Sequence, residues 1–142
     1  MKCIFSLIVG FCFVLGAFSQ SVVGKWKTVD DETGKTRSLV EITEKGGKVY
    51  GHILKLFRAP DEDQDPICDK CPGERKDQKI IGMEIVSGLE QEDEKWVLDD
   101  GILDPEKGKL YDCKIWLKNK NELAVRGYIG FFYRTQTWFR VE

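Results

Sequence analysis

The chain has 142 residues and a formal net charge of −2 at pH 7, from 22 basic and 24 acidic side chains. A charge so close to zero excludes a strongly basic nucleic-acid-binding protein and gives no reason to expect an anionic membrane surface as a partner. The length fits one domain that can bury a stable core without additional cross-links.

Residues 1–19 have the pattern of a secretory signal peptide. Lys2 provides a short basic segment, and a nearly continuous apolar run follows it. The small residues of Ala17-Phe18-Ser19 then precede Gln20, as a signal peptidase requires. The apolar run is shorter than the roughly 20 residues of a transmembrane helix, so we expect no transmembrane segment. The sequence predicts a periplasmic or secreted protein with one domain over residues 20–142.

That domain is expected to consist of short strands separated by turns, without a sustained helical period. The expected strands cover residues 22–29, 37–43, 49–57, 80–86, 95–98, 111–118, 123–129 and 133–141, with a short extended piece at 101–103 and a long polar loop over 58–79. Gly51, inside the third strand, indicates a bulge or a close approach by another backbone.

About eight antiparallel strands in so small a domain predict an all-β fold. We expect a single up-and-down barrel, because closure removes the exposed edges of the sheet. The clearest alternation places one set of side chains on one face of its strand (Tyr111, Cys113, Ile115 and Leu117) and a second set on the other (Asp112, Lys114, Trp116 and Lys118). In the next strand Leu123, Val125 and Ile129 alternate with Ala124, Arg126 and Tyr128.

Two residues far apart in the chain resemble the signature of lipocalin-type barrels. Trp26 follows Gly24 with one residue between them on the first strand, and Arg140 lies near the end of the last. The resemblance implies that the indole closes one end of the barrel and that the guanidinium packs across it. Such a contact is stabilised by cation–π attraction.

A broader set of motifs resembles the bacterial envelope family named domain of unknown function 2147. In chain order these motifs are Gly24-Lys25-Trp26-Lys27-Thr28, Val49-Tyr50-Gly51, Cys68-x-x-Cys71, Ile81-Gly82-Met83, Ile102-Leu103-Asp104-Pro105, Gly108 with Tyr111, Arg126-Gly127-Tyr128-Ile129-Gly130 and Tyr133-Arg134-Thr135-Gln136-Thr137-Trp138. The resemblance implies a small exported domain with a lipocalin-like barrel, and it brings no established activity.

Three cysteines remain after the leader, and outside the cytoplasm they predict one disulfide and one spare buried thiol. We expect the disulfide between Cys68 and Cys71 in the polar loop, because Cys113 shares an apolar strand face. A pairing that uses Cys113, or a metal site that adds His52, is the alternative.

Motifs for other chemistry are incomplete. Asp61, Asp63 and Asp65 resemble the start of a calcium loop, but prolines occupy the positions of the turn glycine and of the final glutamate. His52 is the only histidine and has no nucleophile beside it in sequence. We therefore expect no cofactor, no metal and no enzymatic activity.

The last strand carries the most informative pattern. Its period of two separates Arg134, Gln136, Trp138 and Arg140 from Tyr133, Thr135, Thr137, Phe139 and Val141. If Arg140 packs on Trp26, the first set lines the interior and forms an aromatic wall with a cationic, hydrogen-bonding patch. Such a lumen suits an amphipathic ligand with an acidic head. In the alternative arrangement Phe139 and Val141 fill the core.

These observations predict a monomer that binds a small amphipathic, apolar or lipid-like molecule, without nucleic acid. The candidate ligand-binding residues are Trp26, Tyr50, Arg126, Tyr128, Arg134, Gln136 and Trp138. The alternative is a structural or interaction module whose barrel is filled by its own side chains, since an interior of eight strands permits either arrangement.

The first prediction concerns export. We expect the mature protein to begin at Gln20, because the small residues before it match signal-peptidase specificity. Intact-mass measurement of exported protein checks this. A retained leader, or a lipid attached to Cys12, would contradict it.

Overall fold

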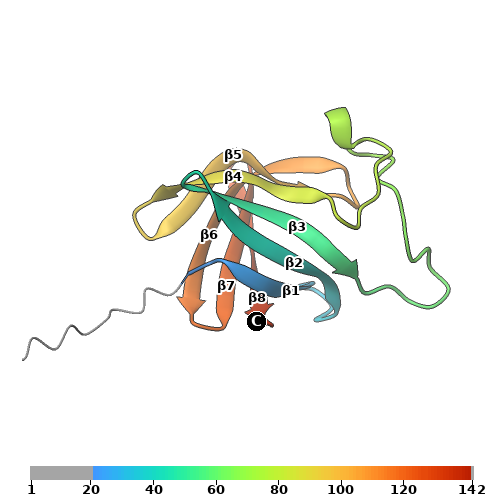
Figure 1. Ribbon diagram of the computed structural model, residues 1–142, viewed down its shortest axis with the longest axis horizontal. Helices are drawn as coiled ribbons and strands as arrows, with labels where there is room; N and C mark the ends of the chain where they lie inside the picture. Colours follow the sequence, from blue (N-terminus) through green and yellow to red (C-terminus); the bar gives the residue numbers. More distant parts are fainter. Residues whose placement is uncertain (1–20, 142) are drawn as a thin grey trace, which may run out of the picture.

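The computed structural model describes residues 21–141, and the predicted signal peptide lies outside this range. Eight antiparallel strands follow one another around a closed barrel in which β8 pairs with β1 (Figure 1). The strands are β1 (Gly24–Val29), β2 (Thr36–Lys45), β3 (Lys48–Leu56), β4 (Glu84–Glu92), β5 (Lys95–Asp104), β6 (Lys109–Asn119), β7 (Glu122–Ile129) and β8 (Phe132–Arg140). The predicted all-β, up-and-down barrel is confirmed.

Two strands differ from the sequence-based expectation. β4 begins at Glu84, because Ile80 and Met83 are buried in a turn in which the Met83 N–H donates to the Ile80 carbonyl. The extended piece expected at 101–103 belongs to the continuous strand β5. The pairing register of β5 shifts beside Asp100, which has a φ of 52°. This irregularity explains why the sequence pattern predicts two separate extended pieces, 95–98 and 101–103, in place of one strand.

Gly51 lies where β3 approaches β4 closely. A Cβ atom at this position would be 3.0 Å from the Cβ of Val86, and the β3–β4 register shifts directly after Gly51. Both the predicted bulge and a close approach are present here, although the approaching group is a side chain.

The long loop between β3 and β4 contains the short 3-10 helix η1 (Gly73–Arg75) and extends from one side of the barrel in Figure 1. Cys68 and Cys71 form a disulfide with a Cα–Cα distance of 5.4 Å, and both are buried. The predicted pairing is confirmed. Cys113 is the buried free thiol, and burial raises its pKa to about 12.

The disulfide segment packs on the turn between β5 and β6. Cys68 Sγ lies 3.2 Å from the Pro105 carbonyl oxygen. The Lys70 carbonyl oxygen lies only 2.0 Å from where a Cβ of Gly108 would be, so this contact requires glycine. The loop is thereby attached to one rim of the barrel. Within residues 21–141 no helix is long and apolar enough to cross a membrane.

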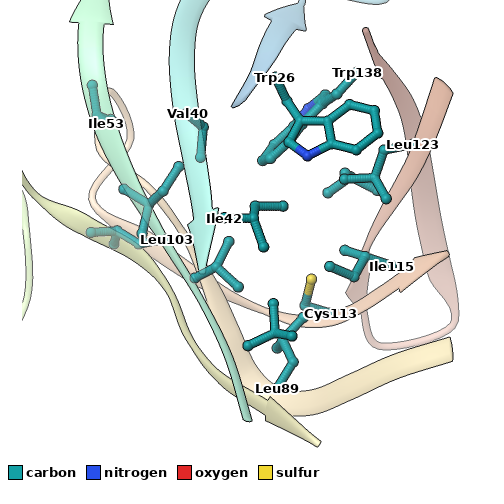
Figure 2. Packing of buried hydrophobic residues seen from close by; sticks show 14 of the residues in the cluster. Trp26, Val40, Ile42, Ile53, Leu89, Leu103, Cys113, Ile115, Leu123 and Trp138 are labelled. Carbon is teal, nitrogen blue, oxygen red and sulfur yellow. The ribbon is translucent and has the colours of Figure 1, made fainter. Parts of the chain in front are cut away.

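The core fills one half of the barrel more densely than the other. Figure 2 shows Trp26, Trp138 and Leu123 grouped together, with the Cys113 sulfur directed into the interior beside Leu89 and Ile115. All six side chains are buried. They lie toward the end of the barrel where β1 begins and β8 ends, and they close it with protein atoms.

The second prediction concerns the disulfide. Replacing both cysteines by Ser (Cys68→Ser with Cys71→Ser) should lower the free energy of unfolding by at most about 2 kcal/mol, because the bond closes a very small ring. The barrel should remain intact, which chemical denaturation and circular dichroism measure. Global unfolding of the double variant, or one bound Zn²⁺ per chain, would refute this account.

Candidate functional site

One end of the barrel is closed by a contact between the first and last strands. Trp26 is fully buried, and its indole N–H donates to the Val22 carbonyl at 2.9 Å. The Arg140 guanidinium carbon lies 4.2 Å from the centre of the indole ring. Arg140 and Trp26 therefore meet in the arrangement that the resemblance to lipocalins implies.

Arg140 also donates hydrogen bonds to backbone carbonyls on both sides of the seam, the junction at which β8 pairs with β1. Its Nε donates to the Lys120 carbonyl at 2.8 Å, and its two terminal nitrogens donate to Val23 and Ser21 at 2.9 and 2.6 Å. All three acceptors are fixed carbonyl oxygens, which a planar guanidinium reaches simultaneously and an ammonium does not. Arg140 thus links the segment before β1 to the β6–β7 turn and covers the buried side chains that fill this end.

The orientation of Arg140 determines the orientation of β8. Since side chains alternate across a strand, Trp138, Gln136 and Arg134 lie on the same face as Arg140. Trp138 is buried, and its indole N–H donates to Gln136 Oε1 at 3.2 Å. Gln136 and Arg134 line the cavity above it.

A cavity of about 560 Å³ opens at the end of the barrel opposite Arg140. Its apolar wall comes from β1, β3, β4, β5, β7 and β8 and from two loops, and consists of Val29, Ile53, Leu56, Ile80, Ile85, Ile102, Leu103, Pro105, Val125, Ile129, Phe132 and Trp138. Five uncharged polar side chains interrupt this wall: Thr28, Ser38, Tyr111, Tyr133 and Gln136. The cavity can therefore enclose an apolar body and offer it a few hydrogen bonds.

Some of the polar side chains in the wall already make hydrogen bonds within the protein. The Thr28 and Ser38 hydroxyls share a hydrogen bond of 2.7 Å, and both residues are buried. Gln136 accepts from Trp138 through its carbonyl oxygen, which leaves its NH₂ group as a donor. Gln136 can thus donate a hydrogen bond to a ligand.

Arg134, at the mouth of the cavity, is already paired with two carboxylates. Its Nε lies 2.6 Å from Asp31 Oδ2, and its terminal nitrogen lies 3.0 Å from Glu32 Oε1. The hydrogen bond to Asp31 raises the pKa of the Arg134 guanidinium. The cationic patch that the sequence indicates is therefore neutralised by the loop between β1 and β2.

A second ion pair lies beside it. Arg37 binds Asp30 at 2.9 Å and approaches Glu106 on the β5–β6 turn at 3.6 Å. The hydrogen bond from Arg37, followed by those from the N–H groups of Thr33 and Glu32, lowers the pKa of Asp30 to about 2. The pair stays charged over the physiological pH range and ties two mouth segments together.

Three predicted ligand contacts lie on the outer face of the barrel. Tyr50 packs over Gly88, with its ring 3.5 Å from where a Cβ of that glycine would be. Arg126 and Tyr128 alternate with Val125 and Gly127, which line the cavity, so their own side chains point outward. Tyr50, Arg126 and Tyr128 therefore do not contact the interior, and their inclusion as lumen residues is corrected. Trp26 is fully buried in the filled half and does not line the cavity, so its inclusion as a ligand contact is corrected as well.

The sequence-based prediction omitted other residues that line the cavity, although the strand pattern indicates two of them. Thr28 lies two positions from Trp26, and Ser38 lies directly opposite Thr28 on β2. Because side chains alternate along a strand, Thr28 points to the same face as Trp26, which is the interior. The sequence pattern does not indicate Asp31 and Glu32, because side chains in a turn do not alternate regularly and their directions depend on tertiary contacts.

The remaining motifs stand apart from the cavity. His52 points away from it and lies 3.9 Å from Glu84. Asp65 of the acidic loop pairs with Lys79 at 2.8 Å. Within residues 21–141 no group of three or more His, Cys, Asp or Glu side chains is arranged to hold a metal ion.

The sequence profile of DUF2147, described as an uncharacterized protein conserved in bacteria, matches residues 24–140. The chain belongs to this family. No curated protein matches it. A solved structure from Helicobacter pylori, described as belonging to the lipocalin family, superposes with a TM-score of 0.70 at 18% sequence identity. The match covers 87% of this chain and 85% of that chain. The DUF2147 chain thus has a lipocalin-like fold.

The third prediction tests the seal. Arg140→Ala should cost about 2 kcal/mol of stability, because it removes hydrogen bonds from a charged donor. In a double-mutant cycle with Trp26→Phe, which limits the cavity left behind, we expect favourable coupling of at least about 0.5 kcal/mol. Denaturant titration measures both.

Arg140→Lys is the matched control, since it keeps the charge and loses the planar group. It should recover only part of the stability. A coupling of zero together with a harmless Arg140→Ala would show that the guanidinium does not hold this end closed.

Proposed function

We propose that this member of DUF2147 binds one small apolar or amphipathic molecule in the open half of its barrel. The observation that carries the proposal is the cavity of about 560 Å³, which exceeds the roughly 300 Å³ at the lower end of ligand pockets. An eight-stranded barrel can be filled by its own side chains or hold one small ligand. Here the half near Trp26 is filled and the other half is hollow.

The charges at the mouth modify the ligand chemistry that the sequence indicates. Arg134 is held by Asp31 and Glu32, so it offers no free cation to an acidic head. Gln136 and Tyr111 present hydrogen-bonding groups among the apolar residues of the wall. Lys107 also lines the mouth, but the carboxylates there (Asp30, Asp31, Glu32, Asp104 and Glu106) outnumber the cations (Arg37, Arg58, Lys107 and Arg134). We therefore propose a ligand with an apolar body and an uncharged polar group in preference to a carboxylate.

The same proposal places the protein in the periplasm or outside the cell, as a monomer that binds without catalysis. The leader pattern of residues 1–19 supports export. The disulfide between Cys68 and Cys71 also supports it, since such bonds persist mainly in oxidising compartments.

The fourth prediction uses N-phenyl-1-naphthylamine, an uncharged apolar probe whose fluorescence rises in apolar surroundings. The wild-type protein should bind it in the cavity. Gly127→Leu should weaken binding about tenfold or more. Gly127 lines the cavity, and a Cβ there would meet only ordinary contacts at 3.5 Å, so the longer side chain fills the space. Fluorescence titration gives both affinities.

The neighbouring substitution Tyr128→Leu is the matched control, because that side chain points outward and should leave probe binding unchanged. Equal probe affinity in the wild-type protein and in Gly127→Leu would overturn the proposed site. Native mass spectrometry of protein from its own envelope should reveal a co-purified small molecule. An empty barrel that also rejects the probe would favour the structural module.

A further inference from the structure

The turn between β7 and β8 exposes an unusual amount of apolar surface. Phe131 is 102% exposed and Phe132 is 81% exposed, while the flanking Ile129 and Tyr133 are 60% and 61% exposed. Single exposed apolar residues are ordinary, but a contiguous apolar patch marks an interaction site. This patch is the tip of a hairpin, and three of its residues (Ile129, Phe132 and Tyr133) also line the mouth of the cavity.

From the tip toward the opposite end of the barrel, the outer face of β6, β7 and β8 and the adjoining β1 is locally basic. Lys27, Lys114, Lys118 and Arg126 point outward here, and none of them has a carboxylate within 4.0 Å in the part of the chain that the structure describes. The acidic side chains of the same face are Asp112 and Glu122, which accept hydrogen bonds from the Asp100 N–H and from Asn119. The net charge of −2 for the whole chain conceals this separation.

Aromatic rings lie between these cations. The Arg126 guanidinium is 4.2 Å from the Tyr133 ring centre and 5.0 Å from that of Trp116. Lys114 Nζ is 5.9 Å from the ring centre of Tyr128. Trp and Tyr beside Arg and Lys are the residues that favour the boundary between lipid and water, because each combines an apolar body with a polar end.

We propose that the hairpin tip and this basic aromatic face dock together on an anionic lipid bilayer. In this docking face Phe131 and Phe132 enter the boundary between head groups and acyl chains, while Lys114, Lys118 and Arg126 contact the negative head groups. The unpaired cations supply the charge complementarity to such a surface.

The observations favour a bilayer over nucleic acid or protein. Cations already stand over the rings of Trp116, Tyr128 and Tyr133, so these rings offer poor stacking platforms for bases. The most exposed ring, Phe131, projects from a two-residue turn, a convex shape suited to insertion into a soft surface. With the tip inserted and the basic aromatic face against the head groups, the barrel is tilted. The cavity mouth beside the tip then lies close to the acyl layer, from which an apolar ligand enters without crossing water. Only this last consequence rests on the proposed function.

The fifth prediction concerns membrane binding. Co-sedimentation of the protein with lipid vesicles, with no other ligand added, measures it. The full mature chain should bind vesicles of phosphatidylcholine mixed with phosphatidylglycerol, and should bind pure phosphatidylcholine much more weakly. Binding should fall as salt is raised, because exposed charges are screened. Phe131→Ser should weaken binding about tenfold, since it withholds one aromatic ring from the bilayer. The pair Lys114→Gln with Lys118→Gln should weaken it at least about fivefold and reduce its salt dependence.

The matched controls lie on β3, which is four strands away from β7 around the barrel. Leu54→Ser replaces an exposed apolar residue there and Lys55→Gln an exposed lysine, and both should leave vesicle binding unchanged. Lys114 is half-buried and the other substituted side chains are exposed. Circular dichroism verifies the fold of each variant.

The proposed docking face would be wrong if the protein bound neither kind of vesicle. It would also be wrong if the β3 control substitutions weakened binding as much as the substitutions at Phe131, Lys114 and Lys118. A dimer that Phe131→Ser disrupts, without vesicle binding, would assign the tip to a second copy instead. Because no ligand is present, failure of this test leaves the probe titration unaffected, and the two proposals fail separately.

Discussion

The contact of Arg140 with Trp26 holds the two ends of the barrel sheet together. β1 and β8 share only two paired positions, Trp26 with Arg140 and Lys27 with Phe139, whereas β7 and β8 are paired along their whole length. The seam would be weak if backbone pairing alone closed it. Arg140 adds three hydrogen bonds to carbonyls on either side and covers a buried indole. The seal makes that end solid, so an opening can exist only at the other.

The same contact divides the side chains of β8 between two surroundings. Once Arg140 faces Trp26, alternation directs Gln136 and Trp138 into the barrel and leaves Tyr133 on the outer face beside Arg126. One strand therefore supplies part of the cavity wall and part of the basic aromatic face. The hairpin tip before it joins the two, since Phe132 borders the cavity and is also largely exposed.

The mouth of the cavity depends on loops that distant residues hold in place. Asp31 and Glu32 bind Arg134, and Arg37 links Asp30 to Glu106 on the opposite turn. On the same rim, the disulfide segment packs against the β5–β6 turn. Arg37 and Arg134 at the mouth are thus neutralised by carboxylates, while Lys114 and Arg126 on the outer face lack carboxylate partners and lie over aromatic rings. Local pairing, rather than net charge, decides which cations are available.

The sequence by itself predicted most of the strands, the barrel, the pairing of Cys68 with Cys71 and the meeting of Trp26 with Arg140. These follow from alternation, turn residues and recognisable motifs, all of which are local or carried by the resemblance. Period two also separated the faces of each strand, and it already grouped Arg126 and Tyr128 against Leu123 and Val125. Alternation cannot say which face is inside, nor which carboxylate meets a given guanidinium. Arg134 and Asp31 are 103 residues apart in the chain, so only closure of the barrel brings them together.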